Sequence, residues 1–466
     1  MLVQFMKIRY RLKQGIVLFG DLLSYTLGLY IAIAIRRSEL PNTDYLLSLL
    51  GIFISTFIIW FIVNYINGLY DLGSYENKTQ FIRRFFETAG IALLVSIIFF
   101  YLHPNKTITP KTILVLTIII GYGLSALWRF LAQRFIRGKH LQSRLLFVGV
   151  TKEVLELIAL FQKRPQNGYL PVAIIEPHPP ENVPDSIDCF KDINKMRAVI
   201  NTKDIDIVVV SDHLKDNDTA VRELYELLFW PVHIHHLGAF YEIITGRISP
   251  TTFSESWFLE HLRNKEQLVY TRLRRVIDYI AALILFVVFV AIFPFIAVAI
   301  KINSSGPIFF TQARVGKSGN VFTLYKFRSM YALAKDGSAE LDGYQFATKD
   351  DTRVTAIGKL LRKTRLDELP QWINLFKGDV TLIGPRPERP QIVEKLTEHM
   401  PYYPLRHIVA PGLTGWAVIH QQYTDTMERS LEKFQYDLFY IKNKSFLIDI
   451  SIILRTINII LRGYGQ

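Results

Sequence analysis

The chain has 466 residues, a formal net charge of +13 and an apolar content of 50%. This length exceeds one ordinary soluble core, which predicts two or three domains, and the apolar content directs the search to membrane segments. A single cysteine, Cys189, excludes an internal disulfide framework and any multi-cysteine metal site. The basic residues are dispersed and form no nucleic-acid-binding motif. We therefore expect membrane lipid and phosphorylated substrates as partners, and no nucleic acid.

Residues 1–139 are predicted to form a transmembrane domain of four helices. Each of four nearly uncharged stretches approaches or reaches the ~20 residues that a helix needs to cross the hydrocarbon core. They lie at 16–35, 46–66, 85–102 and 113–132. No small-residue cleavage site follows the first stretch, which favours a retained span over a signal peptide. Lysine and arginine are more frequent in alternate loops, which places the amino terminus and everything after residue 133 in the cytoplasm.

Three charges, Asp21, Glu87 and Arg129, lie inside these stretches or at their ends. A charge at this depth is costly unless it is paired or reaches the interface. We therefore expect pairing between helices or snorkelling, although an intramembrane charge leaves a functional role open.

Residues 140–250 are predicted to form a Rossmann-like α/β domain, because the runs RLLFVGV, VAIIE and DIDIVVVSD alternate with helical patterns. The first turn has only Gly149, too few glycines for the pattern that lets a backbone approach a dinucleotide, so cofactor binding is not expected. We interpret His233, His235 and His236 as ordinary core or loop histidines rather than metal ligands, because no acidic partner is near in sequence.

Residues 251–466 form the third predicted domain, and its apolar run at 279–300 is long enough to cross a membrane. Basic residues lie on both sides of this run, so both flanks favour the cytoplasm. Pro294 inside the run kinks or breaks a helix. We therefore predict a re-entrant helical hairpin near residues 277–301, with a kinked fifth span as the alternative.

Two adjacent carboxylates, Asp367 and Glu368, stand in the sequence TRLDELPQWINLF. Pro370 suits the first turn of a helix that Gly378 can end, which puts the pair at the positive end of that helix, where a phosphate is favoured. A carboxylate can attack phosphorus when cations disperse the phosphoryl charge, and an acid pair can hold Mg²⁺ against a diphosphate. Taken alone, such a pair is more often a solvated helix end.

Basic residues that could bind phosphate lie in the neighbouring motifs YKFRSM, RKTRLDELPQ and GPRPE, and they are Lys326, Arg328, Arg362 and Arg386. Together with GPIFFTQARVG, PGLTGWA and YDLFYIKNKSFLIDI, these motifs resemble the bacterial sugar transferase family, the monotopic polyprenyl-phosphate hexose-1-phosphate transferases, over about residues 266–466. The four spans and the Rossmann-like domain resemble the long form of that family. The implied fold is a membrane α-helical bundle, an α/β Rossmann-like domain and an α+β catalytic domain with a re-entrant hairpin.

The resemblance implies transfer of a hexose 1-phosphate from a UDP-sugar to undecaprenyl phosphate, with Mg²⁺ as cofactor and release of UMP. Such enzymes start exopolysaccharide, capsule or O-antigen synthesis at the cytoplasmic face of the bacterial inner membrane. Asp367 would be the nucleophile that carries the sugar phosphate, and Glu368 would assist with metal or proton handling. Arg362 and Arg386 would hold phosphate, supported by Lys326 and Arg328.

The same resemblance assigns roles within the predicted hairpin. Pro294 would lie at its bend, and Asp278 with Arg274 and Arg275 would anchor its base at the membrane interface. The small residue that usually precedes the bend proline is Phe293 here.

Several alternatives stay open at the level of sequence. A transferase that moves only the sugar would release UDP and need no carboxylate nucleophile. A membrane-anchored nucleotide-sensing or scaffold protein is a rival of another kind, against which the intact acid pair speaks. The segment 445–463 is expected to pack on the membrane surface or on the domain rather than to span. The sequence identifies neither the sugar nor a homodimer.

Overall fold

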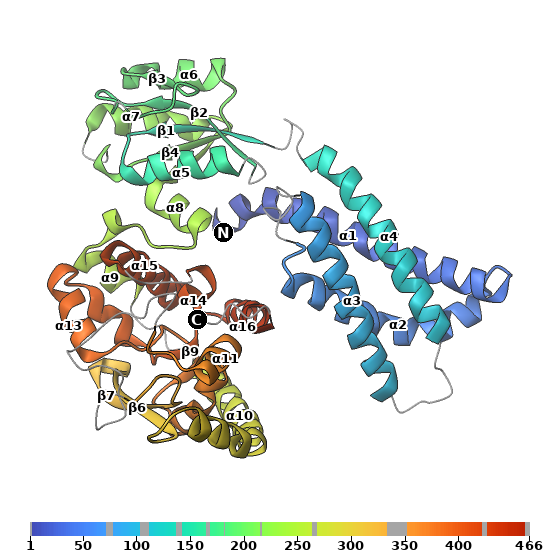
Figure 1. Ribbon diagram of the computed structural model, residues 1–466. Helices are drawn as coiled ribbons and strands as arrows, with labels where there is room; N and C mark the ends of the chain where they lie inside the picture. The colour runs from blue at the N-terminus through green and yellow to red at the C-terminus, as the bar shows by residue number, and fades with distance from the viewer. Residues whose placement is uncertain are drawn as a thin grey trace. The chain divides into compact units, whose positions relative to one another are not determined.

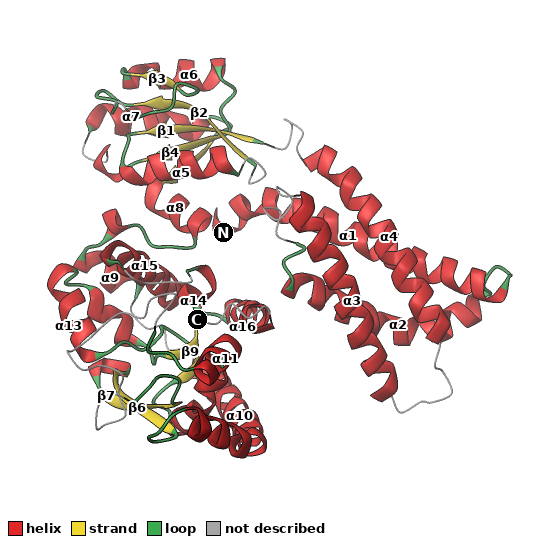
Figure 2. Ribbon diagram, in the orientation of Figure 1, coloured by secondary structure: helices red, strands yellow, loops and turns green. Residues whose placement is uncertain are grey.

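The computed structural model describes residues 2–70, 78–102, 111–136, 142–164, 168–180, 182–214, 217–262, 268–332, 352–421 and 426–461. The chain divides into two compact units, Met1–Ile244 and Thr245–Gln466. The first unit contains an all-helical part and an α/β part, and the second contains helices with two small sheets (Figures 1 and 2). Residues 245–250, which we assigned to the middle domain from sequence, therefore begin the second unit.

The amino-terminal part is a bundle of four long helices, each of which contains an apolar segment long enough to cross a membrane. They are α1 (Leu2–Arg37), α2 (Thr43–Ile66), α3 (Lys78–Leu102) and α4 (Lys111–Ile136). The four stretches predicted from sequence lie within these helices, and together they indicate a membrane protein.

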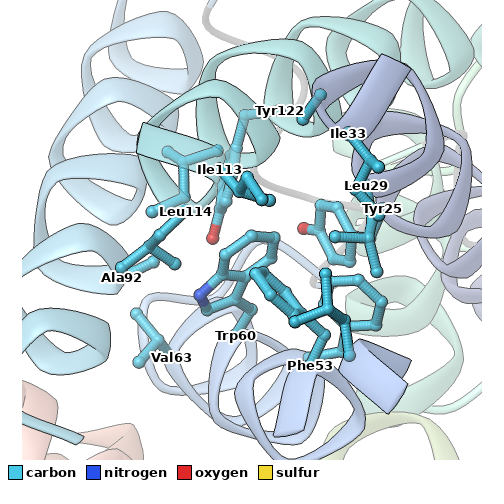
Figure 3. Close-up of a cluster of buried hydrophobic side chains, with 14 of the residues drawn as sticks. Tyr25, Leu29, Ile33, Phe53, Trp60, Val63, Ala92, Ile113, Leu114 and Tyr122 are labelled. Carbon is cyan, nitrogen blue, oxygen red and sulfur yellow. The ribbon is translucent and has the colours of Figure 1, made fainter. Parts of the chain in front are cut away.

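Small residues let α1 and α4 approach closely. A Cβ atom on Gly28 would lie 2.8 Å from the Cα atom of Gly121, and one on Gly20 would overlap the indole of Trp128. In a membrane the hydrophobic effect does not drive helices together, because lipid tails are as apolar as the side chains. Small residues allow close van der Waals packing between helices instead. Figure 3 shows the aromatic core beside this contact, where the ring of Trp60 lies 5.0 Å from that of Tyr25.

A buried ion pair joins α1 to α4. Asp21 and Arg129 form a salt bridge, and both side chains are almost completely buried. Asp21 also accepts hydrogen bonds from Tyr70 (2.9 Å) and Ser125 (2.6 Å), and Arg129 donates to the carbonyl of Leu69 (2.6 Å). This confirms the expected pairing between helices for two of the three intramembrane charges.

The third intramembrane charge, Glu87, pairs within its own helix. Arg83 lies 2.8 Å from Glu87 one turn away on α3, and both side chains are largely exposed. The two pairs therefore have different surroundings.

The middle part is a five-stranded, all-parallel sheet with the order β3-β2-β1-β4-β5, as the Rossmann-like prediction requires. Its elements are β1 (Ser143–Val148), α5 (Lys152–Lys163), β2 (Tyr169–Ile175), β3 (Asp188–Phe190), α6 (Met196–Thr202), β4 (Ile207–Val210), α7 (Asp218–Glu226), β5 (His233–His236) and α8 (Leu237–Thr245).

The β1 strand shows why this sheet is covered on both faces. Leu145 and Phe147 pack in one core with α5 and α8, whereas Leu146 and Val148 pack in the other with α6 and α7. Successive side chains of a strand point to opposite faces, so a continuous apolar run needs a helical layer on each side.

The second unit combines helices with an antiparallel pair, β6 and β7, and a parallel pair, β8 and β9. Its elements are α9 (Glu255–His261), α10 (Leu268–Asn303), β6 (Phe309–Val315), β7 (Val321–Phe327), α11 (Ala356–Thr364), α12 (Trp372–Lys377), β8 (Thr381–Ile383), α13 (Pro390–His399), β9 (Gly412–Thr414), α14 (Trp416–His420), α15 (Met427–Asn443) and α16 (Phe446–Leu461).

The α10 helix is a single helix of 36 residues with Pro294 inside it. One side contacts the second unit along its length: Asp278 accepts a hydrogen bond from Leu382, Ala282 packs beside Leu375, and Ile300 packs beside Leu361. The other side is exposed and apolar, and it includes Ile280, Leu283, Ile284, Val287, Val290, Phe295, Val298 and Ile302. The hairpin itself stays a prediction.

We predict that Arg129→Met destabilises the bundle strongly, because Asp21 would keep a buried charge without its partner. Breaking a buried pair costs about 3 to 5 kcal/mol, so the melting temperature of the purified protein in detergent should fall clearly. Lys203→Gln, which removes a partly exposed pair with Asp188 in the α/β part, is the control and should change it little, since solvent-exposed pairs contribute about 0 to 1 kcal/mol. Equal effects of the two changes would show that the buried pair stabilises the bundle no more than the exposed one.

Candidate active site

The acid pair lies in the turn η9 (Leu366–Gln371), which connects α11 to α12. Arg365 adopts a left-handed conformation (φ 58°) that ends α11, and Gly378 (φ 81°) ends α12. Pro370 lies in η9 and not in the first turn of α12, which begins at Trp372, so the acid pair lies in the turn that precedes that helix. The chain reversal at Arg365 brings Asp367 and Glu368 towards β7.

Asp367 is buried, and its Oδ1 atom has no hydrogen-bond partner within the described part of the chain. The nearest cation is Lys326 on β7, whose Nζ lies 3.9 Å from Oδ2. Buried polar atoms are almost always hydrogen-bonded, so an unpartnered carboxylate oxygen calls for an explanation. A substrate atom that occupies this position in the working protein would supply one.

In contrast, three cationic side chains contact a single carboxylate oxygen of Glu368. Its Oε1 atom lies 2.9 Å from Lys326 Nζ, 3.0 Å from Arg386 Nη2 and 3.5 Å from Arg365 Nη1. Such charge-assisted contacts fix the carboxylate and keep it ionised. The two neighbouring acids therefore have opposite surroundings.

The pKa values of the two acids move apart for this reason. Burial raises the pKa of Asp367, although Lys326 opposes the rise. Burial alone would also raise the pKa of Glu368, but Lys326, Arg386 and Arg365 outweigh it and hold that pKa well below its usual range. Two carboxyl groups whose environments separate their pKa values are typical of a site that gives them different tasks.

Two of the four predicted phosphate-binding residues, Lys326 and Arg386, meet at the acid pair. Arg362 on α11 donates to the hydroxyl of Ser329 (2.9 Å), and its charge lowers the pKa of Asp367. Arg328 is placed differently, because its guanidinium donates to the carbonyls of Ser304 (2.7 Å) and Ser305 (2.8 Å).

The position of Arg328 suits the end of α10. The carbonyls of Ser304 and Ser305 directly follow Asn303, the last residue of α10, where the negative end of the helix dipole favours a cation. Gly306 leaves room for the guanidinium, since a Cβ atom there would lie 2.1 Å from its Nη1. A phosphate-binding role for Arg328 stays a prediction.

The buried side chain of Asn374 fixes β7 against α12. Its amide donates to the carbonyl of Thr323 (2.7 Å) and accepts from the N–H of Tyr325 (3.2 Å). These bonds hold the backbone directly before Lys326. An isolated asparagine in the apolar run WINLF gave no sequence signal for this role.

The predicted anchors at the hairpin base contact β8. Arg274 donates to the hydroxyl of Thr381 (3.0 Å) and to the carbonyl of Ile383, and Asp278 accepts from the N–H of Leu382 (2.8 Å). Arg275 lies near Gly378, at the end of α12. Since β8 leads directly into GPRPE, these contacts connect α10 to the segment that carries Arg386.

Sequence reasoning missed three arginines around the site, namely Arg314, Arg365 and Arg406. Arg365 could have been found, because it stands three residues before Glu368 in a helical turn. Arg314 and Arg406 reach the site from β6 and from the turn before β9, at separations that no local pattern reveals.

Comparison with known proteins places the chain in a family. A model described as bacterial sugar transferase matches residues 269–463. The uncharacterized sugar transferase EpsL of Bacillus subtilis (strain 168) is 36% identical over 197 residues, which cover 41% of this chain and 89% of that protein. The chain belongs to the bacterial sugar transferase family. This confirms the resemblance noted in the sequence.

Two further relatives extend the similarity beyond this region. The UDP-glucose:undecaprenyl-phosphate glucose-1-phosphate transferase of Klebsiella pneumoniae is 28% identical over 94% of this chain and 93% of that protein. The UDP-N-acetylgalactosamine-undecaprenyl-phosphate N-acetylgalactosaminephosphotransferase of Aeromonas hydrophila is 39% identical, and the match spans 55% of this chain and 59% of that protein. A model described as CoA-binding domain matches residues 65–235, which include α3, α4 and most of the parallel sheet.

Proposed function

We propose that this sugar transferase moves a hexose 1-phosphate from a UDP-sugar to undecaprenyl phosphate and releases UMP. The observation that carries the proposal is the buried Oδ1 of Asp367, which has no hydrogen-bond partner among the described residues, beside the Glu368 carboxylate that Lys326 and Arg386 contact. The names of the Klebsiella and Aeromonas relatives support the lipid acceptor and the sugar nucleotide. The product would start exopolysaccharide, capsule or O-antigen synthesis.

The reaction has two displacements at the same phosphorus atom. In the first, an Asp367 oxygen attacks the sugar-bearing phosphorus, the bond between this phosphorus and the bridging oxygen breaks, and UMP leaves with that oxygen. The enzyme then holds an aspartyl-phosphosugar. In the second, a phosphate oxygen of undecaprenyl phosphate attacks the same phosphorus and frees the Asp367 carboxylate, which yields the diphosphate-linked sugar lipid.

The surrounding cations suit this chemistry. Lys326 and Arg386 already contact the acid pair, and Arg362 lies close enough to stabilise charge on Asp367. Phosphoryl transfer depends mainly on positioning and on cations that balance the charge of the equatorial oxygens. Arg328 supports the site less directly, by fixing the end of α10 beside β7.

The donor set also fits Mg²⁺ held together with the substrate. Among the described residues no group of three or more His, Cys, Asp or Glu side chains could hold a metal. Asp367 and Glu368 would therefore provide carboxylate oxygen, with the substrate phosphates and water completing the shell, as Mg²⁺ commonly requires. The ion would neutralise the diphosphate and the leaving UMP.

The membrane arrangement follows from α10. Both of its ends contact the same compact unit, through Asp278 near the start and Ile300 near the end. A plain fifth span would carry these contacts through the hydrocarbon core, so we propose a re-entrant helix that enters one leaflet with its exposed apolar side and bends at Pro294. We also propose that the catalytic unit lies on the cytoplasmic side of the bacterial inner membrane, which the lysine and arginine counts of the loops support.

The first test is nucleotide release by the purified full-length protein with Mg²⁺, undecaprenyl phosphate and a panel of UDP-sugars. We expect UMP with one sugar, and Asp367→Asn should lower the rate by roughly 10⁴-fold or more, as the loss of a nucleophile does. Glu394→Gln, at an exposed position of α13, is the control. Release of UDP would favour the transferase that moves only the sugar, and no release with any sugar would favour the sensing or scaffold alternative.

The pH dependence of kcat/KM should report Asp367, which must be ionised to attack. Because Lys326 lowers the pKa of Asp367, its removal in Lys326→Gln should raise that pKa further and move the acid limb of the profile to higher pH. Lys363→Gln, at an exposed position on α11, should leave the limb in place. A limb that stays fixed or moves to lower pH in Lys326→Gln would contradict the assignment.

Single cysteines in a Cys189→Ser background can test the re-entrant arrangement with an impermeant maleimide. Leu273 and Ile302, exposed positions near the two ends of α10, should both be labelled only from the cytoplasmic side. Leu40, exposed in the loop between α1 and α2, should react from the outside, and Val290 should react from neither side. A kinked fifth span predicts instead that Leu273 and Ile302 react from opposite sides.

A further inference from the structure

The segment 384–388, GPRPE, is held mainly by hydrogen bonds to its carbonyl groups, beside one bond from the N–H of Gly384 to the carbonyl of Thr414 (2.8 Å). Two of its residues are prolines, which lack an N–H donor and restrict φ. Four consecutive carbonyl oxygens each accept one hydrogen bond: Pro385 from Gly412 N (2.9 Å), Arg386 from Arg406 Nη2 (3.0 Å), Pro387 from Arg314 Nη1 (2.9 Å) and Glu388 from Val315 N (2.9 Å). Backbone N–H groups of β9 and β6 therefore hold the two ends of this run, whereas side-chain guanidinium groups hold its middle, at Arg386 and Pro387.

Two of the four donors are guanidinium groups, which also flank the carboxylate of Glu388. Arg406 Nη1 lies 3.9 Å from Glu388 Oε1, and Arg314 Nη1 lies 3.8 Å from Oε2. Lys433 forms a further ion pair with the same carboxylate. Burial alone would raise the pKa of Glu388, but these three cations hold it at about 2, so the carboxylate stays ionised and keeps both guanidinium groups in place.

Arg406 is itself fixed on other sides. It is almost completely buried, donates to Asp437 (2.7 Å) and donates to the hydroxyl of Tyr403. A planar guanidinium with several donors can bond a carbonyl and a carboxylate at once, which an ammonium group cannot do in the same geometry. The carbonyl of Arg386 is thus held by a rigid group.

We propose that Arg314 and Arg406 are positioning residues that set where Arg386 meets Glu368 and the substrate phosphate. The inference rests on the proposed function, in which Arg386 holds phosphate beside Asp367. Both guanidinium groups act through the backbone of residues 386–387, whose carbonyl oxygens they hold. Small displacements of a phosphate-binding group are costly, because phosphoryl transfer depends on position.

The test is a double-mutant cycle on the full-length protein, with kcat/KM for the accepted UDP-sugar as the readout. Arg314→Gln should lower kcat/KM by roughly 10- to 100-fold, the usual effect of losing a supporting group. In an Arg386→Lys background, where the positioned guanidinium is already gone, the same change should cost less than about threefold. Arg314→Lys should restore part of the activity, since it keeps a cation beside Glu388.

The proposal is overturned if Arg314→Gln lowers kcat/KM by the same factor with Arg386 and with Lys at position 386, because that is the result expected of a merely structural role for Arg314. An unchanged kcat/KM in Arg314→Gln would overturn it as well. Arg247→Gln, which removes a similarly buried arginine paired with Glu432, controls for charge and folding. Arg314 is chosen because removal of Arg406 would leave Asp437 buried without its partner and can prevent folding.

The outcome is separable from that of the proposed function. If Asp367→Asn stays active or UDP is released, the covalent mechanism fails, whatever the cycle shows. If UMP release depends on Asp367 and the cycle is additive, the mechanism stands and only the positioning role fails.

Discussion

A single carboxylate oxygen of Glu368 connects three segments of the second unit, Thr245–Gln466, which is the catalytic unit. Lys326 comes from β7, Arg386 from the segment after β8 and Arg365 from the end of α11, and all three reach the same carboxylate oxygen. A half-buried carboxylate in contact with three cations stays ionised, so Glu368 is fixed in charge and position. Asp367, one residue earlier, has Lys326 Nζ at 3.9 Å as its nearest cation and an oxygen with no hydrogen-bond partner among the described residues. The two adjacent acids therefore have different surroundings, which suits the different tasks proposed for them.

The position of each cation depends on packing further away. Asn374 fixes β7 next to Lys326, while Arg274 and Asp278 fix β8 just before the segment of Arg386. The α10 helix thus connects an exposed apolar surface with the segment that carries Arg386. In the proposed reaction a lipid acceptor and a water-soluble sugar nucleotide meet at one phosphorus atom, and a helix with an apolar outer side beside this segment suits that requirement.

The amino-terminal bundle also contains buried charges, and it too neutralises them through ion pairs and hydrogen bonds. Asp21 and Arg129 are almost completely buried, and their partners on Tyr70, Ser125 and the Leu69 carbonyl complete their hydrogen bonds. Charges at membrane depth are tolerated only when they are satisfied within the protein. In the bundle the charges satisfy one another, whereas in the catalytic unit one oxygen of Asp367 is left without a partner among the described residues.

Local patterns in the sequence were sufficient for much of the fold. Residues close together in the chain, where periodicity and turn chemistry act directly, determine four of its features. These are the apolar stretches, the alternation of strand and helix patterns in the parallel sheet, the end of α12 at Gly378 and the motifs of the catalytic part. Local motifs also identified the candidate site residues Asp367, Glu368, Lys326 and Arg386. It also placed Arg328 in the phosphate-binding set, although its guanidinium lies against the carbonyls at the end of α10.

Only the tertiary structure decided which of these candidates meet and what holds them. Lys326 lies 42 positions before Glu368 in sequence, and Arg406 lies 20 positions after the carbonyl that it holds. Contacts at such separations depend on how whole elements pack, and no pattern along the chain records them. The residues along the chain were enough to predict the apolar helices, the parallel α/β domain and the candidate residues of the site. The left-handed turn at Arg365, the burial of Asp367 and the carbonyl contacts of GPRPE were decided by packing, because burial and charge are properties of the surroundings and not of the residue.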